Sequence, residues 1–523
     1  MSSPTRSPAS PRPRTPISIP EQDRRAALGR FYGLVAAVIG GLLGATVLVL
    51  LLGDQTQLVP GAIQPANGAD DVSTRARITI VFDRPLDPSS VEGKLHFDPP
   101  QAGTLQVIAD RTLVFTPAGP WQPDTQYDAT LDPEVRGRAH GRLPRAVRWT
   151  FRTRALRLAF LRPEAQPLHT GAAVQNLWVA DADGTGATRV TSETAGVLDF
   201  DVSGDGAWLV YSAPTGPDAA NLFAIHPDGS GRHALTTDSD AVNSGVACSP
   251  TGDVIAYERR VLLAPAGPEG PTLGVPKLWL VQADGTSLGP LRRGSAAPAS
   301  YGARWSANGE WLAYYEASAA GDQNFIHVGH LGAPGEFVLP NYSGQTGTLS
   351  PDGHLLAYSE QHAVGPAGPP PLTTATPPAA DTTTAPSRGE VRVVVVQPAV
   401  GTPVGASAVP TVLSQDPAAD DGEPVWAPQG AQIAFLRRRD DSPDAGTGLW
   451  LVTPDGAASQ ALTRPQNADD QDPVWSPDGT RLLFRRVLRN AAAASQVWVV
   501  PIRPTPAPAE PLLDNATAAR WLP

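Results

Sequence analysis

The apolar positions of the chain follow three successive patterns, and the first is one continuous stretch. From Phe31 to Gly53 the sequence has no charged residue over 23 positions, and a helix rising about 1.5 Å per residue crosses the hydrocarbon core of a bilayer over that length. Six arginines precede the stretch, and no basic residue follows it before Arg75. The positive-inside bias therefore predicts a single-pass transmembrane helix over residues 31–53, with a cytoplasmic amino terminus and an extracytoplasmic carboxy-terminal part.

The alternative for this stretch is a cleaved signal peptide. A signal peptide has an apolar core of about 7–15 residues and then a small-residue cleavage site, but this stretch is longer and continues into Asp54. We therefore favour an uncleaved anchor. Its Gly40 and Gly44 form a GxxxG pattern through which two helices could pack as a homodimer. The Ser-, Pro- and Arg-rich residues 1–30 are predicted to be a disordered cytoplasmic tail.

The second pattern is a short alternation of apolar and polar residues between turn residues, after a stalk that contains Pro and Gly. It predicts strands over 77–82, 94–97, 104–108, 112–116, 126–131 and 147–153. This spacing is typical of a small β-sandwich. Because side chains alternate between the two faces of a strand, Ile78, Ile80 and Phe82 of one strand are predicted to face inward. Trp149 and Phe151 of the last strand are predicted to do the same.

Three segments of this region read ITIVFDRPLDPSSV, RTLVFTPAGPWQPDTQYDATL and RWTFRT. Through these segments the sequence of the region resembles the bacterial Ig-like module of the type found in the S-layer protein SbsA. With its stalk, the module is assigned to residues 54–154. The resemblance implies a spacer or adhesive domain without catalytic residues, which would hold the next domain away from the bilayer.

The third pattern is an internal repeat that begins after Arg154. One complete unit reads LWLVTPDGAASQALT from Leu449 and PVWSPDGTRLLFRR from Pro473. Six copies of its second half begin at Asp201, Ala247, Arg304, Thr348, Val425 and Val474. In these copies Pro presets φ, Asp or Asn accepts the second turn position, and Gly takes the left-handed position that starts a hairpin.

These units resemble the TolB-type β-propeller repeat, a relative of the Trp-Asp repeats, over residues 155–523. The resemblance implies an all-β propeller of four-stranded blades. A seventh unit, split between the strand at Leu156 and the segment from Gln496 to the end, would close the ring, so we predict seven blades. Six blades, the usual number in the TolB family, remain the alternative. The Pro/Thr-rich residues 363–389 are predicted to be a disordered insertion.

Charge and cysteine content limit the possible partners. The formal net charge is −11, and the amino-terminal tail carries six arginines and two acids, so the rest of the chain is more acidic still. Nucleic-acid binding, which requires positive charge to neutralise the phosphates, is therefore not predicted. Cys248 is the single cysteine, so no intrachain disulfide is available.

No catalytic or metal-binding residues are predicted. The segment from Gly285 to Gly289 matches G-x-S-x-G, but it follows a hairpin turn, whereas a serine hydrolase needs a strand-to-helix elbow. His327 and His330 are spaced i, i+3, which places them on opposite faces of a strand. The peptidases that pair a propeller with an α/β-hydrolase domain need residues beyond the repeats, and the sequence ends at Pro523.

One cluster of residues supports a binding hypothesis. Two successive repeats carry acids directly before Pro-Val-Trp: Asp420, Asp421 and Glu423, and then Asp469, Asp470 and Asp472. If these acids converge on one face of the propeller, they would attract Ca²⁺ or a basic part of a partner. The other interpretation is a solvated polar rim.

The sequence therefore predicts a non-enzymatic interaction or scaffold protein, anchored in a bacterial cytoplasmic membrane with its ectodomain outside. The propeller face would bind a protein, a peptide or an envelope polymer. The alternatives are an extracytoplasmic hydrolase or lyase that uses the propeller channel, and a regulator that signals through the helix to the tail.

Overall fold

The computed structural model describes residues 42–43, 57–138, 141–164, 174–267, 270–292, 298–318, 324–331, 335–363, 387–395, 410–414, 416, 418–439, 446–489, 495–502 and 505–523. The predicted tail 1–30, the predicted transmembrane helix 31–53 apart from Leu42 and Leu43, and the GxxxG pattern of Gly40 and Gly44 lie outside these residues. Within the part of the chain that is described, no helix has the length and apolar character needed to cross a membrane.

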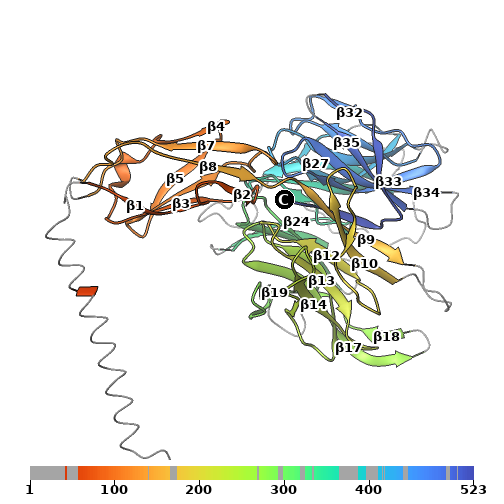
Figure 1. Cartoon of the computed structure of the whole chain (residues 1–523). Coiled ribbons are helices and arrows are strands. Elements are labelled where there is room, and N and C mark those ends of the chain that lie inside the picture. The colour runs from red at the N-terminus through yellow and green to blue at the C-terminus, as the bar shows by residue number, and fades with distance from the viewer. Residues whose placement is uncertain are drawn as a thin grey trace, which may run out of the picture.

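The amino-terminal module is a sandwich of two four-stranded sheets (Figure 1). One sheet has the order β1 (Pro60–Gln64), β3 (Ile78–Phe82), β6 (Thr112–Pro117) and β5 (Gly103–Ile108). The other has the order β2 (Ala69–Val72), β8 (Val147–Thr153), β7 (Gln126–Leu131) and β4 (Leu95–Asp98). A short 3₁₀ helix, η1 (Pro88–Ser90), follows β3.

All six strands predicted for this module are present, but the predicted stalk is partly wrong. Its residues supply β1 and β2, which pair with β3 and β8 at sheet edges. Pro and Gly residues in this segment suggested irregular chain, yet Pro is tolerated on an edge strand because its missing N–H does not interrupt a ladder there.

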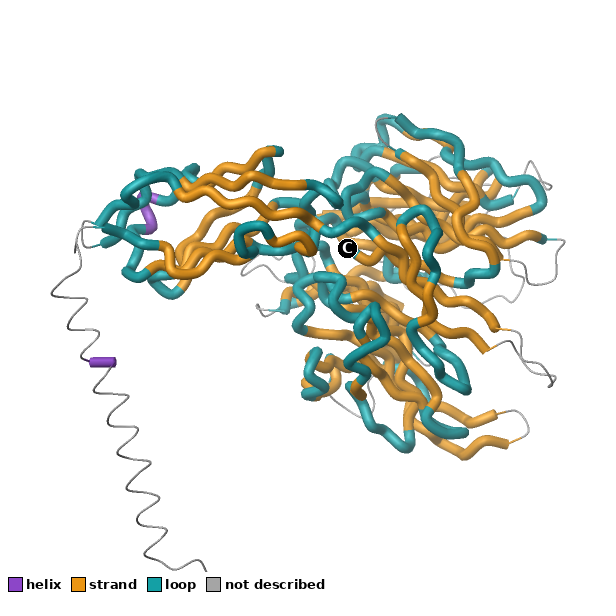
Figure 2. Tube along the Cα trace, in the orientation of Figure 1, coloured by secondary structure: helices purple, strands orange, loops and turns teal. Residues whose placement is uncertain are grey.

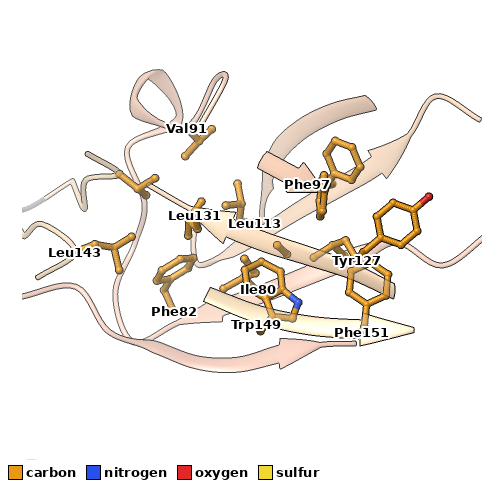
Figure 3. Packing of buried hydrophobic residues seen from close by; sticks show 14 of the residues in the cluster. Ile80, Phe82, Val91, Phe97, Leu113, Tyr127, Leu131, Leu143, Trp149 and Phe151 are labelled. Carbon is orange, nitrogen blue, oxygen red and sulfur yellow. The ribbon is translucent and has the colours of Figure 1, made fainter. Parts of the chain in front are cut away.

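The sandwich core lies between the two sheets (Figure 3). The five predicted core residues, Ile78, Ile80, Phe82, Trp149 and Phe151, are all buried. At the centre is Trp121, whose ring lies 4.8 to 6.0 Å from the rings of four other aromatic residues: Phe97, Phe115, Tyr127 and Phe151. Its indole N–H donates to the carbonyl oxygen of Ala76 at 2.7 Å, which fixes the β2–β3 loop to the core.

The carboxy-terminal domain contains seven antiparallel units of four main strands in its described residues, which we number as blades 1 to 7 (Figures 1 and 2). The strands of each blade are given from the innermost outward. Blades 2 and 3 belong to one nine-stranded sheet, because a single parallel bridge between Ala220 and Val242 joins them. Blade 1 consists of β37 (Ala518–Leu522), β9 (Arg157–Glu164), β10 (Val174–Asp181) and β11 (Thr188–Arg189). Blade 2 consists of β12 (Asp199–Val202), β13 (Leu209–Pro214), β14 (Ala220–Ile225) and β15 (His233–Ala234). Blade 3 consists of β16 (Ala241–Cys248), β17 (Val254–Gly267), β19 (Lys277–Gln282) and β20 (Ser287–Pro290), with β18 (Gly270–Leu273) as an extra hairpin strand on β17.

The remaining four blades repeat the same order. Blade 4 consists of β21 (Ala299–Trp305), β22 (Trp311–Ala317), β23 (Asn324–His330) and β24 (Glu336–Pro340). Blade 5 consists of β25 (Thr348–Leu349), β26 (Leu355–Ala363), β27 (Ser387–Val395) and β28 (Thr411–Val412). Blade 6 consists of β29 (Ala419–Trp426), β30 (Ile433–Arg439), β31 (Gly448–Val452) and β32 (Ser459–Ala461). Blade 7 consists of β33 (Ala468–Trp475), β34 (Arg481–Leu488), β35 (Ser495–Pro501) and β36 (Glu510–Asp514).

The ring closes where the last strand of the chain meets the first strand of the propeller. β37 pairs with β9, so that Ala519 lies opposite Phe160, and this pairing gives both strands a neighbour where each would otherwise be an open edge. The number of blades and the closure of one blade by strands from both ends of the propeller agree with the prediction from the sequence. The predicted composition of the split blade is wrong in one respect, because the strand at Gln496 belongs to blade 7 and only β37 crosses to blade 1.

The structure also tests the predicted Pro-Asp-Gly turns and the predicted Pro/Thr-rich insertion. The Pro-Asp-Gly turns form as expected: Gly353 has a φ of 79° and Gly479 a φ of 65°, both in the left-handed region. The insertion predicted over residues 363–389 is too long at both ends, because Ala363 ends β26 and Ser387–Gly389 begin β27. Residues 364–386 lie outside the described residues.

The two domains meet at the carboxy terminus of the chain, which lies at the junction in Figure 1. The guanidinium group of Arg154 donates to the carbonyl oxygen of Asp71 in the sandwich at 3.2 Å, and to that of Pro523 in the propeller at 3.4 Å. The carboxylate of Asp71 also lies 3.3 Å from Nε of Arg154. The β2–β3 loop itself contacts the propeller through Arg75, which donates to the carbonyl oxygen of Ala307 at 3.4 Å.

Candidate functional site

The candidate site is a cavity of about 650 Å³ at the centre of the propeller. The inner strands or adjoining turns of all seven blades line it, together with Arg75 from the β2–β3 loop of the sandwich. We call this cavity the funnel. Its charged lining residues are Arg75, Asp201, Arg304, Glu423, Asp472 and Arg520. A second cavity of about 480 Å³ lies beside blade 2 and has mainly uncharged Thr, Ala, Gly and Pro residues in its wall. The funnel therefore offers more charged groups to a ligand.

Three of the charged residues occupy one repeated position. Asp201, Arg304 and Arg520 each directly precede the hydrophobic residue that ends the inner-strand motif, as in Arg304-Trp305. The other blades have Ala247, Thr348, Val425 and Val474 at that position, all of which also line the funnel. The repeat therefore aims one residue of every blade at the funnel, and three blades carry a charge there.

Glu423 and Asp472 reach the funnel through β-bulges. The strand register shifts between Gly422 and Val425 in blade 6, and between Gln471 and Val474 in blade 7. Glu423 has a φ of 48° and Asp472 a φ of 53°. A bulge takes a residue off the hydrogen-bonded ladder and redirects its side chain, and a left-handed conformation is costly for a residue with a Cβ.

Blades 3 and 4 have glycine at the equivalent bulge. Gly245 has a φ of 64° and Gly302 a φ of 67°, within the register shifts of their own inner strands. Glycine adopts this conformation without steric cost. The two acids therefore stand where the backbone favours glycine, which makes them candidates for a functional role.

The acids of the funnel have partners within the protein. Asp201 accepts the backbone N–H of Cys248 at 2.8 Å and lies 3.9 Å from Nε of Arg520. Burial raises the pKa of Asp201, although the charge of Arg520 opposes this. Asp472 accepts Nε–H of Arg485 at 2.9 Å. Burial, reinforced by the charge of Asp472, raises the pKa of Glu423.

The arginines of the funnel have fewer partners. Within the described residues, each donates a single hydrogen bond to a backbone carbonyl: Arg75 to Ala307 at 3.4 Å, Arg304 to Ala303 at 3.3 Å and Arg520 to Ala519 at 3.0 Å. A guanidinium group has five N–H donors. Burial lowers the pKa of Arg304 and the charge of Arg520 adds to this shift, whereas the charges of Asp201, Glu423 and Asp472 oppose it. Most of the donors in the funnel are therefore open to a ligand.

The structure brings only two of the six predicted binding acids, Glu423 and Asp472, into the funnel, and the expectation that all six converge is corrected. Asp421 is buried in a two-pronged ion pair with Arg437, at 2.6 and 2.7 Å. Asp470, fully buried, makes the same kind of pair with Arg486, at 2.7 and 2.9 Å.

The remaining two acids link strands. Asp420 accepts the backbone N–H of Gly389 at 2.8 Å. Asp469 accepts the backbone N–H of Thr447 at 2.9 Å and pairs with Arg489 at 2.7 Å. The hydrogen bonds from Arg489 lower the pKa of Asp469 to about 2. These contacts hold blades together, so a ligand-binding role stays a prediction for Glu423 and Asp472 alone.

Sequence reasoning missed Arg75, Asp201, Arg304 and Arg520. The signal for three of them was present, because aligning the inner halves of the repeat places Asp201, Arg304 and Arg520 in one column. Arg75 had no such signal, since its role depends on how the sandwich docks against the propeller.

The histidines and the G-x-S-x-G segment lie as expected. His327 stacks on Tyr314 with ring centroids 5.0 Å apart, whereas His330 lies against Trp311 on the other face of blade 4. Around His327 are Arg292, Glu316 and Glu336, a polar cluster remote from the funnel lining. Gly285 has a φ of 86° in the turn between β19 and β20, so Ser287 lies in a blade and not on an elbow before a helix. In the described residues no group of three His, Cys, Asp or Glu is arranged to hold a metal ion.

Comparison with known proteins identifies the first module. Residues 54–153 match the family model of the bacterial Ig-like domain. This module is a bacterial Ig-like domain. No curated protein matches the chain.

Solved structures that resemble the chain include TolB from Acinetobacter baumannii, with 12% identity over 82% of this chain and 83% of that one, at a TM-score of 0.40. The putative TolB from Agrobacterium tumefaciens has 14% identity over 69% of this chain and 89% of that one, at 0.35. The oligogalacturonate lyase from Vibrio parahaemolyticus has 10% identity over 69% and 87%, at 0.43. The propeller assignment rests on the strand order and ring closure described above.

Proposed function

We propose that the chain is a membrane-anchored extracytoplasmic interaction protein whose funnel binds part of a protein, a peptide or an envelope polymer. The observation that supports this most directly is the funnel itself, a cavity of about 650 Å³ that all seven blades and the Ig-like domain line together. Cavities of this size hold ligands in many proteins. Its arginines keep open donors, whereas Asp421 and Asp470 of the inner strands are paired with arginines of the second strands.

A binding role fits the chemistry of the lining. Cys248 is the thiol in the funnel wall, and burial raises the pKa of that thiol well above its usual value, which keeps it protonated and unreactive. The remaining polar groups suit recognition, since guanidinium groups and carboxylates form directional, charge-assisted hydrogen bonds.

One observation favours the second candidate, an extracytoplasmic hydrolase or lyase. Burial raises the pKa of Glu423, while its neighbour Asp472 is paired with Arg485. Two carboxylates in such different environments can divide the roles of acid and base. Turnover of a bound ligand that disappears in Glu423→Gln, with binding retained, would replace the interaction function by this one.

The membrane anchor and the orientation are part of the proposal and rest on residues 31–53. Protease treatment of intact cells tests them, because an extracytoplasmic Ig-like domain and propeller should be degraded while the cells remain sealed. Survival of the carboxy-terminal part in intact cells, with degradation after lysis, would contradict this topology.

The binding function is tested by crosslinking in intact cells that express the full chain. Gln345 is exposed and lines the funnel, so Gln345→Trp should obstruct the funnel without disturbing the core. Gln106→Trp, on an exposed position of β5 in the Ig-like domain, is the matched control. Crosslinked partners should be lost with Gln345→Trp and retained with Gln106→Trp. Equal recovery with both variants would contradict a role for the funnel.

A further inference from the structure

We propose that the funnel is an anion site that grips an acidic peptide segment through the guanidinium groups of Arg75, Arg304 and Arg520, with Arg75 supplied by the Ig-like domain. This inference rests on the proposed function and specifies the chemistry of the ligand. It also reverses the sign of the partner expected from the sequence, which was a cation or a basic group.

The first argument is the balance of open donors and acceptors. Two of the three acids of the funnel are engaged: Asp201 with the N–H of Cys248 and with Arg520, and Asp472 with Arg485. Arg485 adds a fourth cation next to these carboxylates. The arginines, by contrast, donate one hydrogen bond each to the carbonyl groups named above, so the unmet need in the funnel is for acceptors. A carboxylate fits this need because it accepts two parallel N–H bonds from one guanidinium group.

The second argument is the placement of Arg75. It lies in the loop between β2 and β3, which two contacts hold in place. The Oγ of Ser73 accepts the N–H of Arg75 at 3.2 Å, and the carbonyl oxygen of Thr74 accepts the N–H of Trp121 at 2.7 Å. Because Trp121 is the centre of the sandwich core, the loop is fixed to the domain and does not depend on the propeller for its shape. Arg75 then reaches the carbonyl oxygen of Ala307 in blade 4. The funnel is therefore a composite of both domains.

The third argument concerns the class of ligand. Trp305, Trp426 and Trp475 form part of the funnel wall. The indole N–H groups of Trp305 and Trp475 already donate to Ala247 and Val425 of neighbouring blades, at 3.0 and 3.1 Å. What these two side chains offer to a ligand is therefore apolar ring surface. A peptide with acidic and apolar side chains uses both the rings and the arginines, whereas a uniformly charged polymer leaves the apolar wall unmatched.

The test uses the full chain purified in detergent and fluorescence anisotropy with labelled hexapeptides. The probes are an alternating Glu/Leu peptide and its Gln/Leu and Lys/Leu analogues, and dextran sulfate serves as the polymeric anion. We expect the Glu/Leu peptide to bind about tenfold more tightly than the Gln/Leu peptide, as charge-assisted hydrogen bonds imply. The Lys/Leu peptide should bind less tightly than either. The affinity for the Glu/Leu peptide should fall as salt rises.

Variants assign the effect to residues. Arg304→Ala and Arg75→Ala should each weaken binding of the Glu/Leu peptide by about tenfold. Arg304→Lys should bind the Glu/Leu peptide more tightly than Arg304→Ala but less tightly than the parent chain. Lysine keeps the positive charge, but it cannot donate two parallel hydrogen bonds to one carboxylate. Arg77→Ala is the matched control, since Arg77 is exposed, two residues from Arg75 and outside the funnel lining. Thermal unfolding of each variant shows whether it remains folded.

Equal binding of the three peptides, or unchanged affinity in both funnel variants, would overturn the anion site. Binding that Arg304→Ala weakens and Arg75→Ala does not would overturn the composite site. Binding of dextran sulfate without binding of the Glu/Leu peptide would replace the peptide by a polymer. If crosslinking shows partners that Gln345→Trp abolishes while the peptides show no preference for charge, the proposed function stands and the anion inference fails.

Discussion

The flanks of the blades and the funnel use charge in opposite ways, although they lie only one strand apart. In blades 1, 3, 6 and 7, an arginine of the second strand lies over the tryptophan of the third, with the guanidinium carbon 4.1 to 5.1 Å from the ring centroid. These pairs are Arg162 with Trp178, Arg259 with Trp279, Arg437 with Trp450, and Arg486 with Trp498. Three of the four arginines also have a carboxylate partner: Asp238, Asp421 and Asp470.

Blades 4 and 5 have other residues at these two positions. Glu316 and Glu360 stand on the second strand where the other blades have arginine, and His327 and Arg392 stand on the third where they have tryptophan. Glu316 lies 3.6 Å from His327, and the charge of Arg392 acts on Glu360. In these two blades the repeat therefore keeps polar partners on the same two strands, with other residues in place of arginine and tryptophan.

Among the described residues, the funnel arginines donate no hydrogen bond to a carboxylate, and their one ion pair is the long contact of 3.9 Å between Arg520 and Asp201. This difference shows that charge in a blade can contribute to folding or to recognition, depending on whether a partner is built in beside it. Stability and binding should therefore separate when residues of the two regions are substituted.

The largest expected effect is in a blade flank. Asp470→Asn removes one charge of a fully buried ion pair and leaves Arg486 uncompensated over Trp498, which costs about 3–5 kcal/mol. Denaturant unfolding of the full chain measures this loss. Asp472→Asn is the control, two residues along and half exposed, and it should cost less than about 1 kcal/mol. Similar losses in both variants would remove the distinction between flank and funnel.

The next effect concerns the bulges. Gly302→Ala should destabilise the chain by about 1–2 kcal/mol, because φ is 67° and a Cβ would lie 2.7 Å from Oγ1 of Thr346. At the matching bulge of blade 6, Glu423→Gly should stabilise it by about 1 kcal/mol through relief of the left-handed conformation. Thermal or denaturant unfolding measures both. A loss of stability in Glu423→Gly would show that the carboxylate is structural, as in the flanks.

A smaller effect depends on pH. The pKa of Asp469 is lowered from 3.8 to about 2 in the folded chain, so its pairs add stability that is complete above the unfolded pKa and disappears as pH falls from about 5 to 1, through the folded pKa. Asp469→Asn should therefore cost less than about 1 kcal/mol at pH 7, given the partial exposure of the group, and nothing near pH 1. Urea unfolding at the two pH values compares the variant with the parent chain. A constant difference would mean that the carboxylate does not titrate as described.

The fold was largely predictable because its signals are local. Period-two strands located six of the eight sandwich strands, and repeated Pro-Asp-Gly turns located the blades. β1 and β2 were missed since their Pro and Gly residues favour irregular chain, and only pairing at a sheet edge makes them strands. The outcome for the site was different. The runs around Asp421 and Asp470 looked like a binding face because sequence cannot show that Arg437 and Arg486, sixteen residues later, return beside them.

The smallest expected effect on stability is in the funnel, at Arg304. Arg304→Ala shortens a side chain that is exposed in the funnel, and it breaks one hydrogen bond, at 3.3 Å, to the preceding residue. The free energy of unfolding should therefore change by no more than about 0.5 kcal/mol. The same change at Arg437, whose guanidinium group is buried with Asp421 and Trp450, should cost several times more. Parallel denaturant unfolding of the two variants makes the comparison. A loss above about 1.5 kcal/mol in Arg304→Ala would mean that Arg304 is a structural partner like the flank arginines, and the open donors assigned to the funnel would then be engaged in folding.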